Sequence, residues 1–242
     1  MRFVIGDIHG EFSKLKKLIS LINKIDKNPK LIFLGDYIDK GENSKITLDY
    51  LVELKLKFET IFLMGNHEYQ WLNYNFYTNQ ILEYGGLRTI NDFNSSDIAD
   101  CQNILINKYK KIFDRLKRYV IIENFFICHS GILNETESFK SLNEIKIESL
   151  LFNRYEFLNQ KNLFKSKYKI IFGHTAFYNP YVDDFKIGID TGACYLADQP
   201  LTSFCIDNYD FINSNGESYN IEHINKDYCP LIIRNKKLNK NV

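Results

Sequence analysis

Three predicted strands in the first third of this 242-residue chain are each followed by a glycine and polar side chains, and this feature constrains the fold most. The strands are expected at residues 2–5, 30–34 and 60–64. The segments that follow them are Gly6-Asp7-Ile8-His9-Gly10, Gly35-Asp36-Tyr37-Ile38-Asp39-Lys40-Gly41 and Gly65-Asn66-His67-Glu68. In open α/β sheets, ligands bind at the carboxyl ends of the strands. We therefore expect these polar side chains to meet at one edge of a sheet.

Helical patterns separate the predicted strands. Residues 11–23 and 44–56 carry apolar side chains at the spacing of an amphipathic helix. Crossovers of this length join parallel strands and are almost always right-handed. A hairpin is predicted where residues 119–122 and 125–128 flank Glu123-Asn124. Further strands are expected at 169–172, 185–189 and 201–207. The pattern predicts an α/β fold with a parallel or mixed sheet covered by helices.

The rest of the chain is expected to form part of the same unit. Residues 69–117 are polar and helical in pattern, which predicts a helical insert at about 69–117 rather than a second domain. We expect a single domain over 1–242, with a flexible basic tail at 234–242.

Charge and cysteine content limit the partners and the cellular location that we expect. With 31 Lys+Arg against 30 Asp+Glu, the formal net charge is +1, so no overall field favours nucleic acid or an anionic membrane. Apolar runs are strand-sized, and neither a membrane span nor a secretory leader is expected. The five cysteines form no CxxC pair, which indicates a reduced, cytoplasmic location.

Four of the five histidines follow predicted strands. His9 and His67 lie in the segments above, His129 begins His129-Ser130-Gly131, and His174 lies in Gly173-His174-Thr175. Only His223 does not follow a strand. A single histidine in such a place is more often structural, but four of them interleaved with Asp7, Asp36 and Asn66 favour a metal site.

Six side chains are candidates for metal ligands. Converging carboxylates would raise one another's pKa unless a cation neutralised them. Mixed imidazole, carboxylate and amide ligands suit Mn, Fe or Zn. Six ligands are too many for one tetrahedral ion with an open position, but they suffice for two ions if Asp36 bridges. Two such ions clamp the attacking and leaving oxygens of an in-line displacement. The candidates are Asp7, His9, Asp36, Asn66, His129 and His174.

The ordered motifs GDIHG, GDYIDKG, GNHE, His-Ser-Gly and GHT resemble those of the calcineurin-like metallophosphoesterases. Within them the chain is similar to the phosphoprotein phosphatase branch, which includes lambda-phage-type and bacterial Ser/Thr phosphatases and the symmetrical diadenosine tetraphosphatases. The resemblance implies two packed mixed β-sheets flanked by helices. It also implies two divalent ions, with Mn²⁺ leading and Fe or Zn as alternatives.

The resemblance also implies a role for each site residue. Asp7, His9 and Asp36 would hold one ion. Asp36, Asn66, His129 and His174 would hold the other. His67 would be the general acid, oriented by Asp39. Arg154 resembles the phosphate-binding arginine of the family, and Lys40 stands where most members of the branch carry a second arginine. Lysine keeps that charge but loses the bidentate geometry.

The expected activity is hydrolysis of a phosphomonoester by a metal-activated water or hydroxide that attacks in line. A Ser/Thr phosphoprotein or phosphopeptide is the leading substrate, with a small phosphoester as the other option. The alternative is symmetrical bis(5′-nucleosyl)-tetraphosphatase activity. A second alternative is a non-catalytic metal-binding scaffold, but the ligand set and proton donor are all present. The sequence carries no expectation about oligomeric state.

Overall fold

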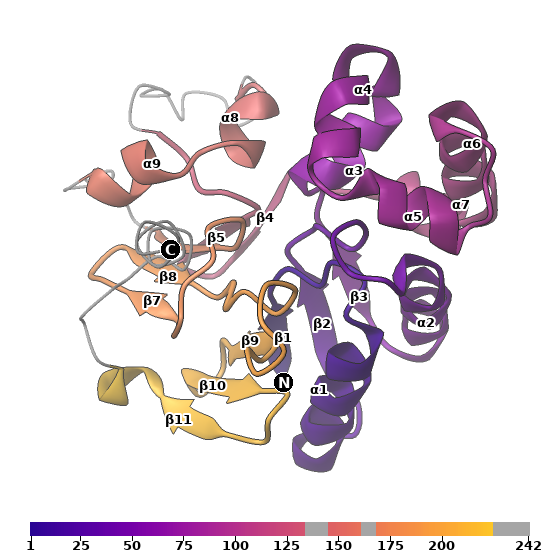
Figure 1. Ribbon diagram of the computed structural model, residues 1–242. Coiled ribbons are helices and arrows are strands. Elements are labelled where there is room, and N and C mark those ends of the chain that lie inside the picture. Colours follow the sequence, from indigo (N-terminus) through magenta and orange to yellow (C-terminus); the bar gives the residue numbers. More distant parts are fainter. Residues whose placement is uncertain (134–144, 161–167, 225–242) are drawn as a thin grey trace, which may run out of the picture.

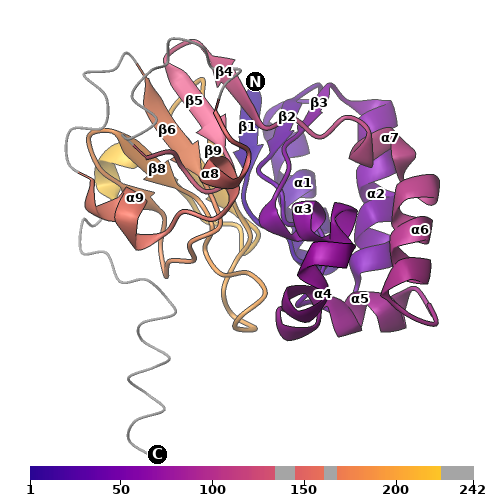
Figure 2. The same cartoon turned by 90° about the horizontal axis from the view of Figure 1, so that it is seen from above.

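The computed structural model describes residues 1–133, 145–160 and 168–224, and the predicted tail at 234–242 lies outside this range. Two sheets pack face to face (Figures 1 and 2). The first contains, in spatial order, β11 (Ser218–Asn220), β10 (Asp210–Asn213), β9 (Thr202–Cys205), β1 (Arg2–Ile5), β2 (Lys30–Phe33) and β3 (Thr60–Phe62). The second contains β4 (Tyr119–Ile122), β5 (Phe125–Cys128), β6 (Lys169–Phe172), β8 (Lys186–Gly188) and β7 (Tyr181–Val182).

The strand directions explain how distant motifs meet. Strands β1, β2 and β3 are parallel, and β5, β6 and β8 are parallel in the second sheet. The predicted hairpin is confirmed as the antiparallel β4–β5 pair. Since parallel strands carry their carboxyl ends to the same side, each sheet delivers its polar segments to one edge.

Three apolar layers hold the sandwich together. Along β1, Phe3 and Ile5 pack toward the helices of the first sheet while Val4 packs between the sheets, as the two-residue period of a strand requires. The layer between the sheets also contains Ile127 and Ile171. Strands buried on both faces read as continuous apolar runs, which is how they appear in the sequence. The implied fold of two mixed sheets flanked by helices is confirmed.

Helices cover the outer faces (Figure 1). The first sheet is covered by α1 (Phe12–Ile25), α2 (Ser44–Lys57) and the insert, whose helices are α3 (Asn66–Leu72), α4 (Tyr74–Glu83), α5 (Gly86–Asp92), α6 (Ile98–Lys108) and α7 (Lys110–Phe113). The second sheet carries α8 (Glu148–Leu151) and α9 (Tyr155–Asn159). A 3₁₀ helix spans Ile221–His223. The insert begins at Asn66, three residues earlier than expected, so Asn66 and His67 lie in the first turn of α3.

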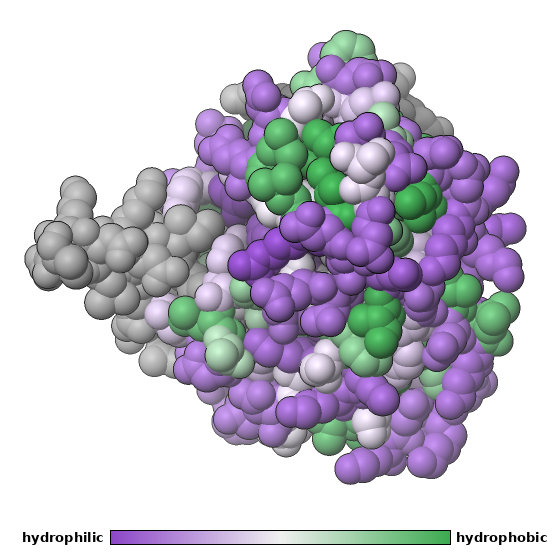
Figure 3. Space-filling view, turned by 45° about the vertical axis from the view of Figure 1, so that its right-hand side comes forward, coloured by the Kyte–Doolittle hydropathy of each residue, from purple (hydrophilic) through white to green (hydrophobic). Residues whose placement is uncertain are grey.

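The surface carries no broad apolar area on the face in Figure 3, where apolar residues form separate small patches within a mostly hydrophilic surface. Isolated apolar residues of this kind are normal on a folded protein. Among the described residues, no helix combines the length and the apolar character that crossing a membrane requires.

Candidate metal site and active site

The loops after β1 and β2 are fastened to each other by backbone hydrogen bonds. The amides of Ile8 and His9 both donate to the carbonyl of Asp36, at 3.0 and 2.8 Å, and the amide of Gly41 donates to the carbonyl of His9 at 3.0 Å. His9 and Asp36 are therefore held side by side before any ligand binds. Such preorganisation spares a site the cost of ordering its side chains on binding.

Five site residues have backbone conformations that L-residues rarely adopt. The φ angles are 47° at His9, 51° at Asp36, 68° at Asp39, 58° at Lys40 and 64° at His174. Conformations of this kind cost of order 1–3 kcal/mol each and persist where the surrounding structure fixes them. They cluster at functional sites, and here they turn each side chain inward at the end of a strand.

Two groups of ligand atoms share Asp36. One group consists of His9, Asp36 and His67, and the other of Asp36, His129 and His174, with one ligand atom from each member of a group within 4.8 Å of the others. Asp36 Oδ2 lies 3.3 Å from His9 Nε2, and Asp36 Oδ1 lies 3.5 Å from His129 Nε2. Asn66 joins the second group, since its Oδ1 lies 3.0 Å from His129 Nε2. The two carboxylate oxygens of Asp36 thus face different sets of imidazoles.

Two glycines make room for the carboxylates. A Cβ at Gly65 would overlap with Asp36 Oδ1, and a Cβ at Gly173 would overlap with Asp7 Oδ1. The glycines in GNHE and GHT are thus required by close approach of an acidic side chain to the backbone.

The donor set fits divalent cations, because lone pairs face one another in the centre. His9 Nδ1 donates to the Ile38 carbonyl at 2.9 Å and His129 Nδ1 donates to the Leu34 carbonyl at 3.0 Å. The proton on Nδ1 leaves Nε2 with its lone pair directed at Asp36. A backbone carbonyl bound to the far nitrogen is the usual support of a metal-ligating histidine. The Lys40 ammonium, 2.8 Å from His9 Nε2, is already a positive group at one of these lone pairs.

The protonation states agree with this fit. Burial and the Lys40 ammonium lower the pKa of His9 to about 4, and burial also lowers the pKa values of His129 and His174. Burial acts to raise the pKa of Asp36, but the surrounding imidazoles outweigh it and hold that pKa well below its usual range. Neutral imidazoles and an ionised carboxylate are the forms that bind metal.

Asp7 lies in the site but outside the two groups. Its Oδ2 accepts the amide of His174 at 2.9 Å, while Oδ1 is buried without a hydrogen-bond partner. Burial and the neighbouring Asp190 carboxylate raise the pKa of Asp7 well above its usual value. An orphaned buried carboxylate oxygen is costly, and a cation would satisfy it. His67 occupies the place in the first group that the sequence had predicted for Asp7.

The predicted general acid and its partner are in direct contact. His67 Nδ1 lies 2.6 Å from Asp39 Oδ2, and His67 Nε2 points toward the centre, 3.9 Å from Asp36 Oδ2. Asp39 also accepts the Thr89 hydroxyl at 2.6 Å and the Trp71 indole at 3.0 Å. These donors fix the orientation of the Asp39 carboxylate, which in turn holds the His67 imidazole in place.

The two predicted phosphate ligands lie on opposite sides of the site. Arg154 Nη1 donates to the carbonyl of His174 at 2.6 Å. Lys40 reaches His9 and lies over the Tyr195 ring at 5.2 Å. Burial acts to lower the pKa of Lys40, but Tyr195 and Asp36 outweigh it and raise that pKa. Each of the ten predicted site residues contacts at least one other, although their chemical roles stay predictions.

Sequence reasoning missed three supporting residues. Glu68 is fully buried, and its carboxylate accepts the amides of Asp36, Tyr37 and Gly65 at 2.8 to 3.1 Å. Trp71 and Thr89 are not among the predicted site residues, yet both donate hydrogen bonds to Asp39. The signal for Glu68 was present, because it is the last residue of the GNHE motif, and an acidic residue in the first turn of a helix can accept backbone amides.

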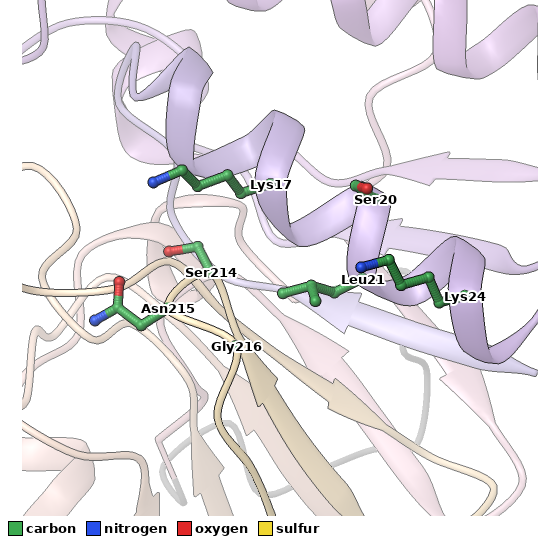
Figure 4. Close-up of a pocket in the computed structure, with 7 residues that line it drawn as sticks. All are labelled: Lys17, Ser20, Leu21, Lys24, Ser214, Asn215 and Gly216. Atoms are coloured by element: carbon green, nitrogen blue, oxygen red, sulfur yellow. The ribbon is translucent and has the colours of Figure 1, made fainter.

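One pocket on the described surface lies away from the site. A pocket of about 480 Å³ opens between α1 and the turn that joins β10 to β11 (Figure 4). None of its lining residues belongs to the site, and Lys17, Ser20 and Lys24 are exposed surface groups. The chemistry is therefore located by the ligand atoms, not by cavity volume.

The fold and the clustered imidazole, carboxylate and amide side chains fit one family of proteins. The chain belongs to the calcineurin-like phosphoesterase family, whose pattern it matches over residues 3–218.

Named relatives include two kinds of phosphatase. The chain is 24% identical over 228 residues to the asymmetrical bis(5′-nucleosyl)-tetraphosphatase PrpE of Oceanobacillus iheyensis. This alignment covers 87% of this chain and 90% of the relative. It is 34% identical over 134 residues to the Ser/Thr-protein phosphatase PP2A-like PPG1 of Candida albicans. That match covers 53% of this chain and only 28% of the relative.

Solved structures show the same fold. A putative diadenosine tetraphosphatase matches with a TM-score of 0.61 at 16% identity, over 88% of this chain and 91% of that one. A cold-active protein tyrosine phosphatase matches with a TM-score of 0.67 at 17% identity, over 90% of this chain and 77% of that one.

Proposed function

We propose that the protein hydrolyses phosphomonoesters at a two-ion site, with Ser/Thr phosphoproteins as its substrates. The observation that carries the proposal is Asp36, whose two oxygens face separate groups of imidazoles while His67 is directed at the same centre. A single-ion site needs no shared carboxylate. A scaffold without turnover needs no buried His67–Asp39 pair, and this pair is intact at 2.6 Å.

The proposed ligand sets are those that the sequence motifs imply, and the buried, unpartnered Oδ1 of Asp7 supports the inclusion of Asp7. One ion would be held by Asp7, His9 and Asp36, and the other by Asp36, Asn66, His129 and His174. When bound, two such ions bring a shared water toward a pKa of about 7 and neutralise charge on the phosphoryl group. Manganese is the proposed ion for assays, since the oxygen and imidazole donors suit it.

The chain's own side chains perform the remaining steps. Arg154 binds phosphoryl oxygens with its planar guanidinium, and Lys40 adds a point charge on the other side. His67 gives the proton on Nε2 to the leaving oxygen, and Asp39 keeps the imidazole oriented.

The substrate test compares two substrates with one enzyme preparation. With Mn²⁺ present, we expect a phosphoserine peptide to be hydrolysed with a kcat/KM at least ten times that for diadenosine tetraphosphate. Release of phosphate from the peptide and of nucleotides from the dinucleotide would be followed side by side. A preference for the dinucleotide would overturn the phosphoprotein proposal while leaving the two-ion site in place.

A dinucleoside tetraphosphatase is the second candidate because of how the relatives align. PrpE matches along nearly its whole length, whereas the PP2A-like phosphatase matches over 28% of its own length. The sequence pattern had favoured symmetrical cleavage, and the relative is named as asymmetrical. The nucleotide products identify the outcome, since symmetrical cleavage gives two ADP and asymmetrical cleavage gives ATP and AMP.

Lys40→Arg tests the point-charge contact. Because a guanidinium can grip two oxygens at once, we expect the KM for a phosphomonoester to fall severalfold while kcat changes little. Steady-state kinetics measure both. An unchanged or raised KM would show that Lys40 takes no part in holding phosphate.

A further inference from the structure

Lys186 in β8 is a buried cation that the proposed mechanism does not use. Its side chain is only 2% exposed. Lysine is almost never buried to this extent unless its ammonium is paired, because desolvation of the charge is expensive. Burial lowers the pKa of Lys186, and Asp183 opposes that change. The partners of Lys186 show what the buried charge holds in place.

The ammonium is directed at the end of α9. Lys186 Nζ donates to the carbonyls of Leu158 and Gln160, at 2.9 and 2.8 Å, and lies 3.3 Å from Asp183 Oδ2. The carbonyls at a helix C-terminus have no partner within the helix and carry its negative dipole end. Lys186 from β8 satisfies two of them here.

The same ammonium lies over the ring of Phe157, 5.4 Å from its centroid. Phe157 is fully buried and packs edge-on against Phe172 with ring centroids 5.0 Å apart. A Cβ at Gly131 would overlap with the Phe157 ring, so the ring rests directly on the backbone two residues after His129. Phe172 lies two residues before His174. The middle of α9 thus packs against the ends of β5 and β6, which are followed by His129 and His174 of the second ligand group.

Arg154 lies at the other end of α9. It is the N-cap residue, its carbonyl accepts the amide of Leu158 at 3.0 Å, and its guanidinium donates to the His174 carbonyl. A helix of five residues is not stable on its own in water. Its position, and with it the position of the Arg154 backbone, depends on contacts made from outside the helix.

We propose that Lys186 is a positioning residue that sets the phosphate grip of Arg154 by anchoring the C-terminal end of α9. The inference rests on the proposed role of Arg154. It concerns substrate binding and not the metals, so its effect should appear in binding of the phosphoryl group rather than in metal content.

The test is a double-mutant cycle on the manganese-loaded enzyme. Arg154→Ala alone is expected to raise KM and the inhibition constant of inorganic phosphate by about 10-fold or more, since hydrogen bonds to charged groups are among the stronger ones. Lys186→Met keeps the aliphatic stem but removes the ammonium. We expect it to raise both constants by about 5-fold, with kcat changed less than 2-fold, because small displacements of a binding group weaken its contacts.

The decisive result is whether the effects of the Lys186 and Arg154 substitutions depend on each other. If Lys186 acts through Arg154, then Lys186→Met in the Arg154→Ala background should leave KM and phosphate inhibition unchanged. Equal fold-changes in both backgrounds, or a loss confined to kcat, would overturn the inference. An Arg154→Ala enzyme with unaltered KM would instead overturn the proposed role of Arg154, so the two failures are distinguishable.

Two further variants keep the test secure. Lys30→Met removes a lysine paired with Glu59 at the amino end of β2 and should change neither constant. Should Lys186→Met fail to fold, Phe157→Leu loosens the same helix from its seat and should show the same coupling with Arg154→Ala. Additive effects for Phe157→Leu would overturn the inference equally.

Discussion

Replacing Asp36 with asparagine is expected to lower kcat/KM by at least about 10³-fold, since even partners outside the ligand shell cost 10–100-fold when they are removed. Asparagine keeps the size of the side chain but loses its charge and one of its two strong acceptor oxygens. Both imidazole groups face Asp36, so the substitution removes a ligand from each proposed ion. We expect bound manganese, measured by elemental analysis after dialysis, to fall from two ions per chain to at most one.

A matched control uses another aspartate. Asp49→Asn removes a half-exposed carboxylate of α2 that pairs with Lys108 of α6 at 2.9 Å. This substitution should leave both activity and metal content unchanged. Full metal content in Asp36→Asn would show that Asp36 is not a shared ligand. Full activity with reduced metal would contradict the need for two ions.

Replacing His67 with asparagine is expected to cut kcat by about 10²–10⁴-fold on a substrate with a poor leaving group, which is the usual contribution of a general acid. A serine alkoxide needs a proton as it departs, whereas a nitrophenolate hardly does. We therefore expect a much smaller loss on p-nitrophenyl phosphate than on a phosphoserine peptide. The measurement is kcat for both substrates with wild type and variant.

Metal content separates this role from ligation. His67 Nδ1 is engaged by Asp39, and its Nε2 lies near the centre, where it belongs to one group of candidate ligands. As a general acid, His67 can be lost without loss of manganese, so His67→Asn should retain two ions per chain. Equal losses of kcat on aryl and alkyl phosphates, or loss of an ion, would contradict the assigned role.

The sequence was sufficient to predict the parallel strands and the edge of the sheet at which their polar side chains meet. Strands β1, β2, β5 and β6 are buried on both faces, so their apolar runs and their bounding glycines are visible in the sequence. Short elements were missed. Strands β10 and β11 (DFIN and SYN) contain no apolar run longer than two residues, and β7 has only two residues. Helices α8 and α9, with four and five residues, are too short to show a helical period.

The supporting contacts of the site were beyond sequence reasoning for a different physical reason. Trp71 and Thr89 meet Asp39 from elements 32 and 50 residues away, and Lys186 reaches α9 from 28 and 26 residues away. Such pairs are set by tertiary packing and leave no local spacing to read. The motif residues that follow the strands could be predicted, because the positions of those strands can be predicted from the sequence.

The central claim is that two cations lie on either side of Asp36. Crystals grown or soaked in Mn²⁺ test it most directly, through anomalous difference maps at a wavelength where manganese scatters strongly. We expect two peaks about 3.5–4 Å apart, bridged by the Asp36 carboxylate, as in two-metal sites generally. A single peak in fully loaded crystals, or peaks remote from Asp36, would contradict the claim.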